Sequence, residues 1–433
     1  MVSTEAQGAV DVAAVMDRSP MGPLQWTTLA LCFLCMVVDG FDIQALGYTA
    51  PTIVREWGVA NAVMGPVFAA GNVGVLIGSL VFSMAADRIG RRPVLIVGTV
   101  FFGLMTLLTA RAGGITQLLA LRLVAGIGLG SIAPNVSALV AEYSPARHRA
   151  TVIMIVGVGL TVGGVIGGFV SAALIPACGW RAVFYLGGVI PLVIALLMAI
   201  LLPESLPLMV LLGKRPDRLA AWANRIDPSL GATAATRFTG PDRRPSGVPI
   251  LALFREGRAP STLLLWVANF MNLFNLYALS SWLPTLIREA GLPAATAVLV
   301  GATLQLGGAI GTFGLAWLVS RGGFVRTLGI TFIIASVAIA TIGTGGLPLP
   351  WLYAVVFVAG WCVVGTQPGL NALSGAFYPT AMRSTGVGAG LGVGRIGAVV
   401  GPIIGGRLMA AQWTQESCST RQPSRRSWRL PRS

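Results

Sequence analysis

Apolar segments of about twenty residues recur along this chain of 433 residues, and they constrain its fold more than any other feature. Soluble domains rarely repeat such uninterrupted runs, whereas a helix of this length crosses the hydrocarbon core of a bilayer. With 55% hydrophobic and only 10% charged residues, the chain is expected to be an all-α polytopic membrane protein. We predict eleven membrane helices, at residues 24–50, 63–86, 93–112, 115–141, 150–176, 182–202, 260–284, 294–320, 325–346, 350–374 and 384–408.

The basic residues are distributed by loop and are not gathered on one surface. The net charge of +15 therefore does not indicate a nucleic-acid partner. The loops after the even-numbered helices carry Arg88, Arg91 and Arg92; Arg147 and Arg149; a basic run from Lys214 to Arg258; Arg321 and Arg326; and Arg383. By the positive-inside rule these loops and the N-terminus lie in the cytoplasm of a multi-pass protein that is embedded in the lipid bilayer.

The chain divides into two halves that resemble each other at a constant offset of 234 residues. Gly126, Pro134, Tyr143, Pro145 and Arg149 match Gly360, Pro368, Phe377, Pro379 and Arg383 in this order. Such internal repeats are typical of transporters whose two bundles rock against each other. We expect a six-helix bundle at 1–202, a polar cytoplasmic linker at 203–259 without a core of its own, a five-helix bundle at 260–410 and a disordered basic tail at 411–433.

Glycines recur at helical spacing in corresponding places of the two halves. The fifth predicted helix contains Gly159, Gly163, Gly164, Gly167 and Gly168, and the eleventh contains Gly397, Gly401, Gly405 and Gly406. Small residues every four positions let two helix backbones approach closely. One copy of this pattern is a weak signal, but two copies in a duplicated chain predict close helix packing in both bundles.

Two acids, Asp39 and Asp42, lie deep in the first apolar segment. A charge in this position costs about 2.5–3.5 kcal/mol on the insertion scale, so such residues are usually functional. The spacing of three residues places both carboxylates on one face of a helix. We expect them to face an aqueous pathway, where they would couple transport to protons.

Several motifs resemble those of the major facilitator superfamily. They are Asp87-Arg88-Ile89-Gly90-Arg91-Arg92, Arg122-x-x-x-Gly126-x-Gly128, the glycines of the fifth helix, and the Pro145 and Pro379 loops. Asp39-Gly40-Phe41-Asp42, Glu142-Tyr143 and the run from Gly394 to Pro402 are similar to the aromatic acid:proton symporters. The resemblance implies the major facilitator fold, with two pseudo-symmetric bundles, and import of a small aromatic acid with a proton across the bacterial inner membrane.

Depth along the helices places the charged residues relative to one another. At 1.5 Å per residue, Asp42 lies roughly 27 Å from the cytoplasmic start of its helix, and Arg122 lies roughly 10 Å from the outer surface. The two are therefore at about the same level in a core of roughly 30 Å and are expected to pair. A purely structural ion pair is the alternative. Against it, Arg122 has Val356 as its counterpart at the 234 offset, so the charge is not a relic of duplication.

Arg395 reaches roughly 17 Å into the opposite half, near the midplane, where it could hold a substrate carboxylate through bidentate hydrogen bonds. The seventh helix adds Asn269, Asn272, Asn275 and Tyr277, whose amides and phenol suit a hydroxylated ring. Among these we expect Asn272 and Tyr277 to bind substrate. Hydrogen bonding between helices is the alternative for each asparagine.

Charged residues at the cytoplasmic end are expected to form a gate. The loop after the second helix supplies Asp87, Arg88, Arg91 and Arg92, and Glu142 lies beside it at the end of the fourth helix. We expect ion pairs among them to close the cytoplasmic side and to break when the bundles rock. Two motif positions differ from the family pattern, since Ser83 replaces a glycine and Ser320 replaces an acid.

The composition changes abruptly near Ala410, where the family's twelfth helix should begin. We expect eleven helices with the twelfth missing, and a truncated or frame-shifted form that transports poorly. Proton-driven efflux of an organic compound, or a transport-dead remnant or receptor that only binds ligand, are the alternatives to import. We expect no enzymatic activity, no metal and no cofactor, and a monomer; no phosphate-binding loop is present, and Lys214 is the only lysine.

Overall fold

The computed structural model describes residues 10–213, 216–239, 250–344, 346–379 and 382–419, which are mostly helical. Eleven helices in this part of the chain are long and apolar enough to cross a membrane, which confirms the prediction. The first six are α2 (Pro23–Trp57), α3 (Met64–Ile89), α4 (Arg91–Thr109), α5 with α6 (Ile115–Leu129, Ile132–Tyr143), α7 (Arg149–Cys178) and α8 (Trp180–Leu201). The other five are α11 (Ala259–Glu289), α12 (Ala294–Gly322), α13 (Phe324–Gly343), α14 with α15 (Leu349–Val363, Thr366–Phe377) and α16 (Arg383–Ser419).

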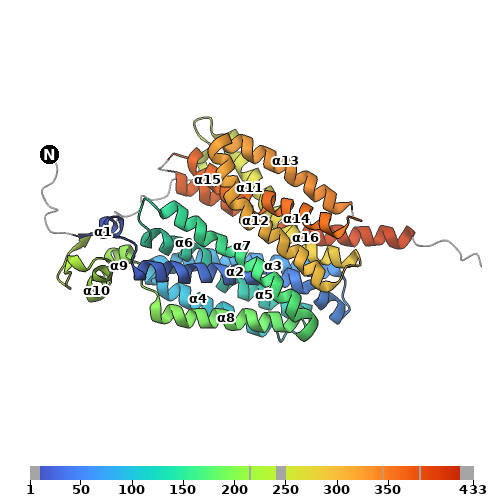
Figure 1. Cartoon of the computed structure of the whole chain (residues 1–433), viewed down its shortest axis with the longest axis horizontal. Helices are drawn as coiled ribbons and strands as arrows, with labels where there is room; N and C mark the ends of the chain where they lie inside the picture. Colours follow the sequence, from blue (N-terminus) through green and yellow to red (C-terminus); the bar gives the residue numbers. More distant parts are fainter. Residues whose placement is uncertain (1–9, 214–215, 240–249, 345, 380–381, 420–433) are drawn as a thin grey trace, which may run out of the picture.

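The helices form two bundles, with α2–α8 below and α11–α16 above in Figure 1. Local sequence sets where the helices begin and end. Helix α2 starts at Pro23, after Gly22, whose backbone N–H donates to the side chain of Gln25 at 2.7 Å. It stops at Gly58, whose φ of 62° is the left-handed conformation that glycine adopts at low cost.

The fourth and tenth membrane segments are each broken once, at equivalent places. One break separates α5 from α6 at Gly130 and Ser131, and the other separates α14 from α15 at Val364 and Gly365. Gly130 and Val364 are themselves 234 residues apart, so the duplicated sequence gives a duplicated bend. Breaks of this kind line interior space in transporters, because the freed backbone groups need polar surroundings.

Glycines bring the helices of each bundle into backbone contact. A Cβ added at Gly163 of α7 would lie 1.9 Å from the carbonyl oxygen of Val37 in α2, and one at Gly397 of α16 would lie 2.3 Å from that of Phe270 in α11. These two helix pairs are equivalent under the internal repeat. The glycine motifs of the fifth and eleventh helices therefore pack as the sequence predicts.

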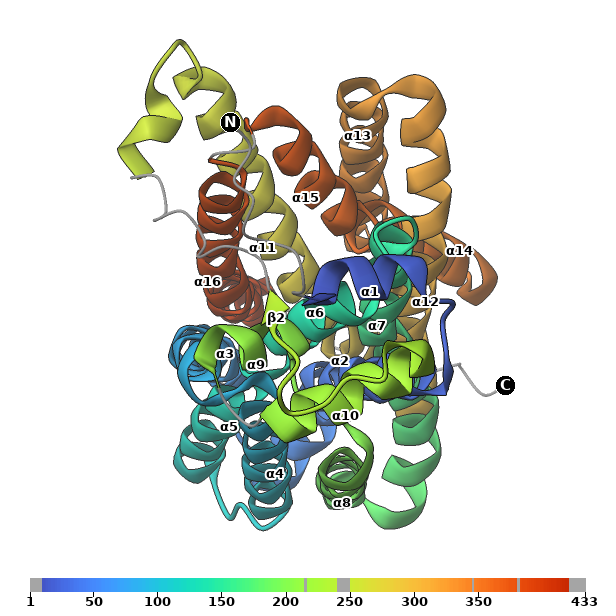
Figure 2. The same ribbon diagram turned by 90° about the vertical axis from the view of Figure 1, so that its left-hand side faces the viewer.

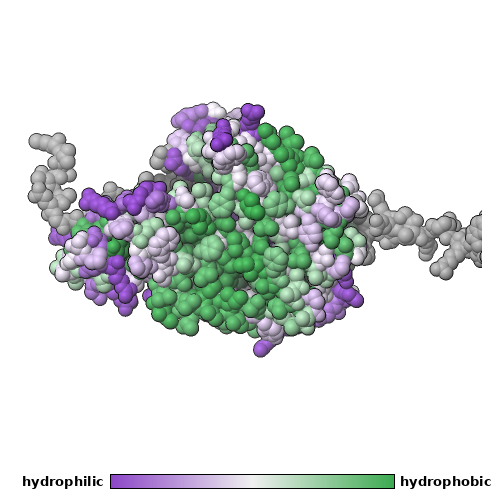
Figure 3. Space-filling model, in the orientation of Figure 1, coloured by the Kyte–Doolittle hydropathy of each residue, from purple (hydrophilic) through white to green (hydrophobic). Residues whose placement is uncertain are grey.

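Apolar side chains cover the outside of the bundles, and polar ones are buried inside. Figure 3 shows hydrophobic residues across the middle of one face and hydrophilic residues gathered towards its two ends. Leu80, Ile200, Ile333 and Trp351 are among the large apolar side chains left exposed, whereas Asp39, Asp42, Arg122 and Asn272 are buried. A soluble protein exposes few such large apolar side chains in one belt, so this surface fits contact with lipid.

The N-terminal residues and the linker fold together at one end of the molecule, which we call the linker end (left in Figure 1, facing the viewer in Figure 2). Here β1 (Val10–Asp11) pairs in parallel with β2 (Phe238–Thr239), and α1 (Val12–Arg18) lies near α10 (Pro216–Ile226). The remaining linker elements are α9 (Leu206–Leu212), η2 (Pro228–Leu230) and η3 (Ile250–Phe254).

The described part of the linker folds against the first bundle. Leu206, Met209, Leu219 and Ile226 are buried, and they belong to the same apolar cluster as the interior of that bundle. Helix α10 packs there because it is amphipathic. At the other boundary α16 continues to Ser419, into the predicted tail at 411–433, and residues 420–433 lie outside the described part.

The contacts between the bundles gather away from the linker end. Next to the opposite end, Phe68 packs edge-on against Trp282 with 5.3 Å between ring centroids, and Asn61, just before α3, hydrogen-bonds to Glu289. The amide of Asn72 donates to the carbonyl of Ala398 at 3.0 Å, farther in but still in the half away from the linker. These contacts hold the bundles together at the end opposite the linker.

The close contact at Gly163 yields a testable prediction. Gly163→Ala should lower the stability of the folded protein by about 1–3 kcal/mol, because the added methyl group forces the backbones of α2 and α7 apart. The matched control is Gly157→Ala in the same helix, where an added Cβ meets nothing within 4 Å. Thermal unfolding of the purified protein in detergent measures both, and equal melting temperatures for the two variants would contradict the packing account.

Candidate functional site

A buried ion pair joins α2 to α5 inside the first bundle. One guanidinium nitrogen of Arg122, Nη1, donates to both carboxylate oxygens of Asp42, at 3.1 and 3.2 Å. The side chains are only 4% and 8% exposed. The pairing predicted from depth along the two helices is therefore present in the structure.

Neighbouring groups fix the orientation of this pair. The other terminal nitrogen of Arg122 donates to the hydroxyl of Thr109 at 2.8 Å, and the Thr106 hydroxyl donates to Asp42 at 3.3 Å. The guanidinium also lies over the ring of Phe184, 5.1 Å from its centroid. Arg122 Nε is buried without a hydrogen-bond partner among the described residues. These contacts give a hydrogen-bond partner to both carboxylate oxygens of Asp42 and to both terminal nitrogens of Arg122, and they leave the Nε–H of Arg122 without one.

The ion pair lines a small cavity of about 50 Å³ between the two bundles. From the first bundle come Asp42, Arg122 and Asn72, and from α11 of the second come Tyr277 and Ser281. Helices from both bundles thus contribute to one polar interior space. A change in how the two bundles pack would therefore change the surroundings of the ion pair.

The second acid of α2 is linked to the second bundle. Asp39 is 5% exposed and interacts electrostatically with Arg395 of α16. Arg395 is half-buried and also interacts electrostatically with Tyr277 of α11. Asp39 of the first bundle, close to Asp42 in sequence, is therefore electrostatically coupled to Arg395 of the second.

Amide side chains form a separate network in the second bundle. Asn272 donates to the side-chain oxygen of Gln367 at 2.8 Å, and Gln367 donates to Asn269 at 3.3 Å and to Asn371 at 3.4 Å. Hydrogen bonding between helices, the alternative for the asparagines, is thus present for Asn272 and Asn269. Asn275 donates to the carbonyl of Met271 in its own helix.

The predicted gate is only partly assembled. Arg91 pairs with Glu142 at 3.0 Å, as expected, and Arg92 donates to the carbonyl of Ala199 at 2.5 Å. Asp87 is exposed at the end of α3 and forms no ion pair with a described residue in this structure, so its part in the gate stays a prediction. Arg88 is exposed at the same end.

One acid that the sequence analysis missed, Glu204, connects the end of α8 to the start of α4. Glu204 lies just after α8, and its Oε1 accepts hydrogen bonds from the backbone N–H groups of Arg91, Arg92 and Ser205 at 2.9–3.1 Å. It thereby caps the N-terminus of α4, where backbone donors are otherwise unpaired and negative charge is favoured. Among the described residues, no cluster of three or more His, Cys, Asp or Glu suits a metal ion.

Comparison with known proteins identifies the family. The model of the Major Facilitator Superfamily matches residues 32–402, which is most of the chain. The chain belongs to the major facilitator superfamily. The chain is 36% identical to the 4-hydroxybenzoate transporter PcaK of Pseudomonas aeruginosa, over 96% of this chain and 94% of that protein. It is 37% identical to a gallate transporter of Pseudomonas putida, over 95% of this chain and 91% of that protein.

More distant relatives and solved structures agree with this placement. A benzoate transport protein of Acinetobacter baylyi is 32% identical over 93% of this facilitator and 87% of that protein. The crystal structure of a bacterial homologue of the lysosomal transporter Spinster has a TM-score of 0.70 at 21% identity, covering 93% of this chain and 87% of that one. The D-xylose–proton symporter has a TM-score of 0.65 at 17% identity, covering 87% and 89%. The two structures show the fold, and the relatives confirm the resemblance to aromatic acid transporters.

Of the two residues that the sequence analysis missed, Gln367 carries a signal in the sequence and Glu204 does not. Gln367 has Ala133 as its counterpart at the 234 offset, so it is an asymmetric polar residue in a duplicated scaffold, like Arg122. The same argument would have found it. Glu204 carries no such signal, because its partners are backbone groups that only the packing of α4 against α8 brings near.

The ion pair predicts non-additive effects on stability. Asp42→Asn and Arg122→Gln should each destabilise the protein by about 3–5 kcal/mol, because each leaves an uncompensated charge in the interior. The double variant should lose much less than the sum, since it leaves no buried charge. Thermal unfolding of the four proteins in detergent checks this, and additive losses would show that the two side chains do not interact.

Proposed function

We propose that this facilitator is a secondary transporter that imports an aromatic carboxylate together with a proton, by alternating access, across the inner membrane of a bacterium. The observation that carries the proposal is the buried Asp42–Arg122 pair, which lines a cavity shared with Tyr277 of the other bundle. The relatives named for 4-hydroxybenzoate, gallate and benzoate support the substrate class. We propose that it acts as a monomer and catalyses no reaction.

Arg395 is the proposed partner of the substrate carboxylate. A guanidinium offers two parallel donors to a carboxylate, and such charge-assisted bonds are stronger than neutral ones. Tyr277, which lines the cavity beside Asp42, would supply a hydroxyl and an aromatic face for the ring. Asn272 would meet a ring substituent by exchanging its bond to Gln367 for one to the substrate.

Asp42 and Asp39 are the proposed proton carriers. When Asp42 takes up a proton, it no longer neutralises Arg122, and the freed guanidinium attracts an anion into the cavity. Protonation of Asp39 would likewise release Arg395 from its acid partner. Proton and anion thus favour each other's binding. The proton neutralises the carboxylate that had compensated the arginine, and the anion then compensates the arginine in its place. Proton and substrate cross the membrane together when the packing between the bundles changes.

The linker end is proposed to face the cytoplasm, with the N-terminus on that side, following the distribution of arginines. The contacts Phe68–Trp282 and Asn61–Glu289 would then close the outer side. In this arrangement the cytoplasmic gate would be incomplete, with the Arg91–Glu142 pair formed and Asp87 exposed. When the bundles rock to open the outer side, Asp87 would join Arg91, Arg92 and Glu142.

Uptake of labelled aromatic acids tests the proposed function directly. Wild-type protein in proteoliposomes should accumulate 4-hydroxybenzoate against its gradient, and a protonophore should abolish the accumulation. Asp42→Asn should also abolish it, because an amide keeps the shape of the acid but does not titrate. The control is Glu56→Gln, which removes a carboxylate at the end of the same helix, paired with Arg181 outside the cavity. Full accumulation by the Asp39→Asn/Asp42→Asn double variant would contradict the assignment.

The role of Arg395 predicts a change in affinity with charge preserved. Arg395→Lys should raise the apparent KM for the aromatic acid about tenfold, the loss expected when one charge-assisted hydrogen bond is removed. Arg288→Lys is the matched control, because Arg288 donates to the carbonyl of Leu292 at the far end of α11. Uptake kinetics on both variants decide the matter, and an unchanged KM for Arg395→Lys would refute the role.

The proposed gate predicts a shift in conformational population. Asp87→Asn should weaken the state that is closed at the linker end, since the amide does not form ion pairs with the arginines. Cysteines introduced at the inner surface of this end should therefore react faster with a membrane-impermeant thiol reagent. Identical labelling rates in the variant and the wild type would argue against any role of Asp87 in closure.

A further inference from the structure

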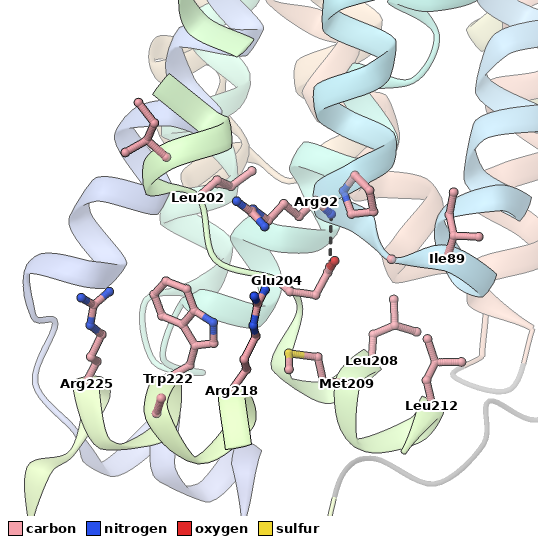
Figure 4. Close-up of a pocket in the computed structure, with 14 residues that line it drawn as sticks. Ile89, Arg92, Leu202, Glu204, Leu208, Met209, Leu212, Arg218, Trp222 and Arg225 are labelled. Atoms are coloured by element: carbon pink, nitrogen blue, oxygen red, sulfur yellow. Dashed lines mark hydrogen bonds between the residues drawn. The ribbon is translucent and has the colours of Figure 1, made fainter. Parts of the chain in front are cut away.

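A second cavity, much larger than the one beside Asp42, lies at the linker end. Its volume is about 670 Å³, and it is enclosed by the end of α3, the start of α4, the end of α8, and helices α9 and α10 (Figure 4). None of the residues that line it belongs to the Asp42 cavity. The proposed transport cycle gives it no role.

The side chains around this cavity are divided by polarity. Figure 4 shows Arg225, Trp222 and Arg218 on one side, and Leu208, Leu212 and Ile89 on the other. The guanidinium of Arg225 lies 5.0 Å from the centroid of the Trp222 ring. A ligand that fits both sides has a negatively charged head and an apolar body.

The cations of this cavity are not neutralised by its single acid. Glu204 lines the space, but its Oε1 already accepts three backbone hydrogen bonds at the start of α4. Arg92 donates through Nη2 to a backbone carbonyl, and its Nε is buried with no partner among the described residues. Arg218 and Arg225 are exposed, so the cavity is lined by three guanidinium groups and one carboxylate. A bound anion would balance part of the remaining positive charge.

The position of the cavity adds a second argument. It lies where α8 ends at Leu201 and α4 begins at Arg91, which is the boundary between the apolar belt and the polar linker end. Ile200 and Ile89, both of which line it, are 67% and 59% exposed, so its apolar side is continuous with the lipid-facing surface. Basic pockets at this level between membrane helices are suited to anionic lipid headgroups.

We propose that this cavity binds one anionic phospholipid. The phosphate and its headgroup lie among Arg92, Arg218 and Arg225, and an acyl chain runs past Ile89 and Ile200 into the bilayer. The lipid thereby ties α10 of the linker to the first bundle. Because Arg92 follows Arg91 directly, the site is adjacent to the Arg91–Glu142 pair of the gate.

Thermal stabilisation of the purified, detergent-solubilised chain by added lipid tests the proposal without measuring transport. We expect phosphatidylglycerol to raise the melting temperature saturably, and phosphatidylcholine at the same mole fraction to have little effect. Arg225→Gln should weaken the apparent affinity for phosphatidylglycerol about fivefold, the effect of one basic residue at an anionic surface. The matched control, Arg255→Gln, removes an exposed arginine that does not line the cavity and should leave the affinity unchanged.

A second variant and a second probe separate the cavity from general surface charge. Ala221→Trp places a large side chain in the cavity without altering any charge, and it should abolish the stabilisation by phosphatidylglycerol. Inorganic phosphate should not replace the lipid, because it makes no use of the apolar side. Equal stabilisation by phosphate, equal loss with Arg225→Gln and Arg255→Gln, or full stabilisation of Ala221→Trp would each overturn the proposal.

Discussion

The interior of this protein depends on the pairing of charges that are shielded from water. An unpaired aspartate or arginine inside a bilayer is costly, and the loss of one partner from a buried pair leaves the other uncompensated. Asp42 and Arg122 meet this constraint through two hydrogen bonds between them and through Thr106, Thr109 and Phe184 around them. In the proposed mechanism the same constraint makes the pair responsive, since a proton on Asp42 would leave Arg122 uncompensated until another anion binds.

The scaffold around the pair is nearly symmetric, whereas the chemistry is not. Glycines hold α7 against α2 and α16 against α11 in equivalent ways, and both the fourth and the tenth membrane segments break at matching positions. On this repeated frame the first bundle carries the acids and Arg122, and the second carries Arg395 and the amides around Gln367. The cavity beside Asp42 and Arg122 is completed by Tyr277 and Ser281 of the second bundle, so the surroundings of the ion pair depend on how the bundles are packed. An alternating-access transporter requires this property.

Most of the fold was predictable because membrane helices follow from local composition, and the level of a residue follows from helix rise. These two rules located the eleven spans and the Asp42–Arg122 pair, and the spacing of small residues located the glycine contacts. They did not locate Glu204, whose partners are backbone groups of another helix, or the folding of the linker, where α10 gains stability from apolar residues of α1 and the first bundle.

The central claim is that substrate and proton bind together because Asp42 releases Arg122. Titration calorimetry of 4-hydroxybenzoate binding, in buffers of different ionisation enthalpy, measures the protons taken up per substrate bound. We predict proton uptake by the wild-type protein near neutral pH and a clearly smaller uptake by Asp42→Asn. Binding without proton uptake by the wild type, or the same uptake by the variant, would contradict the account.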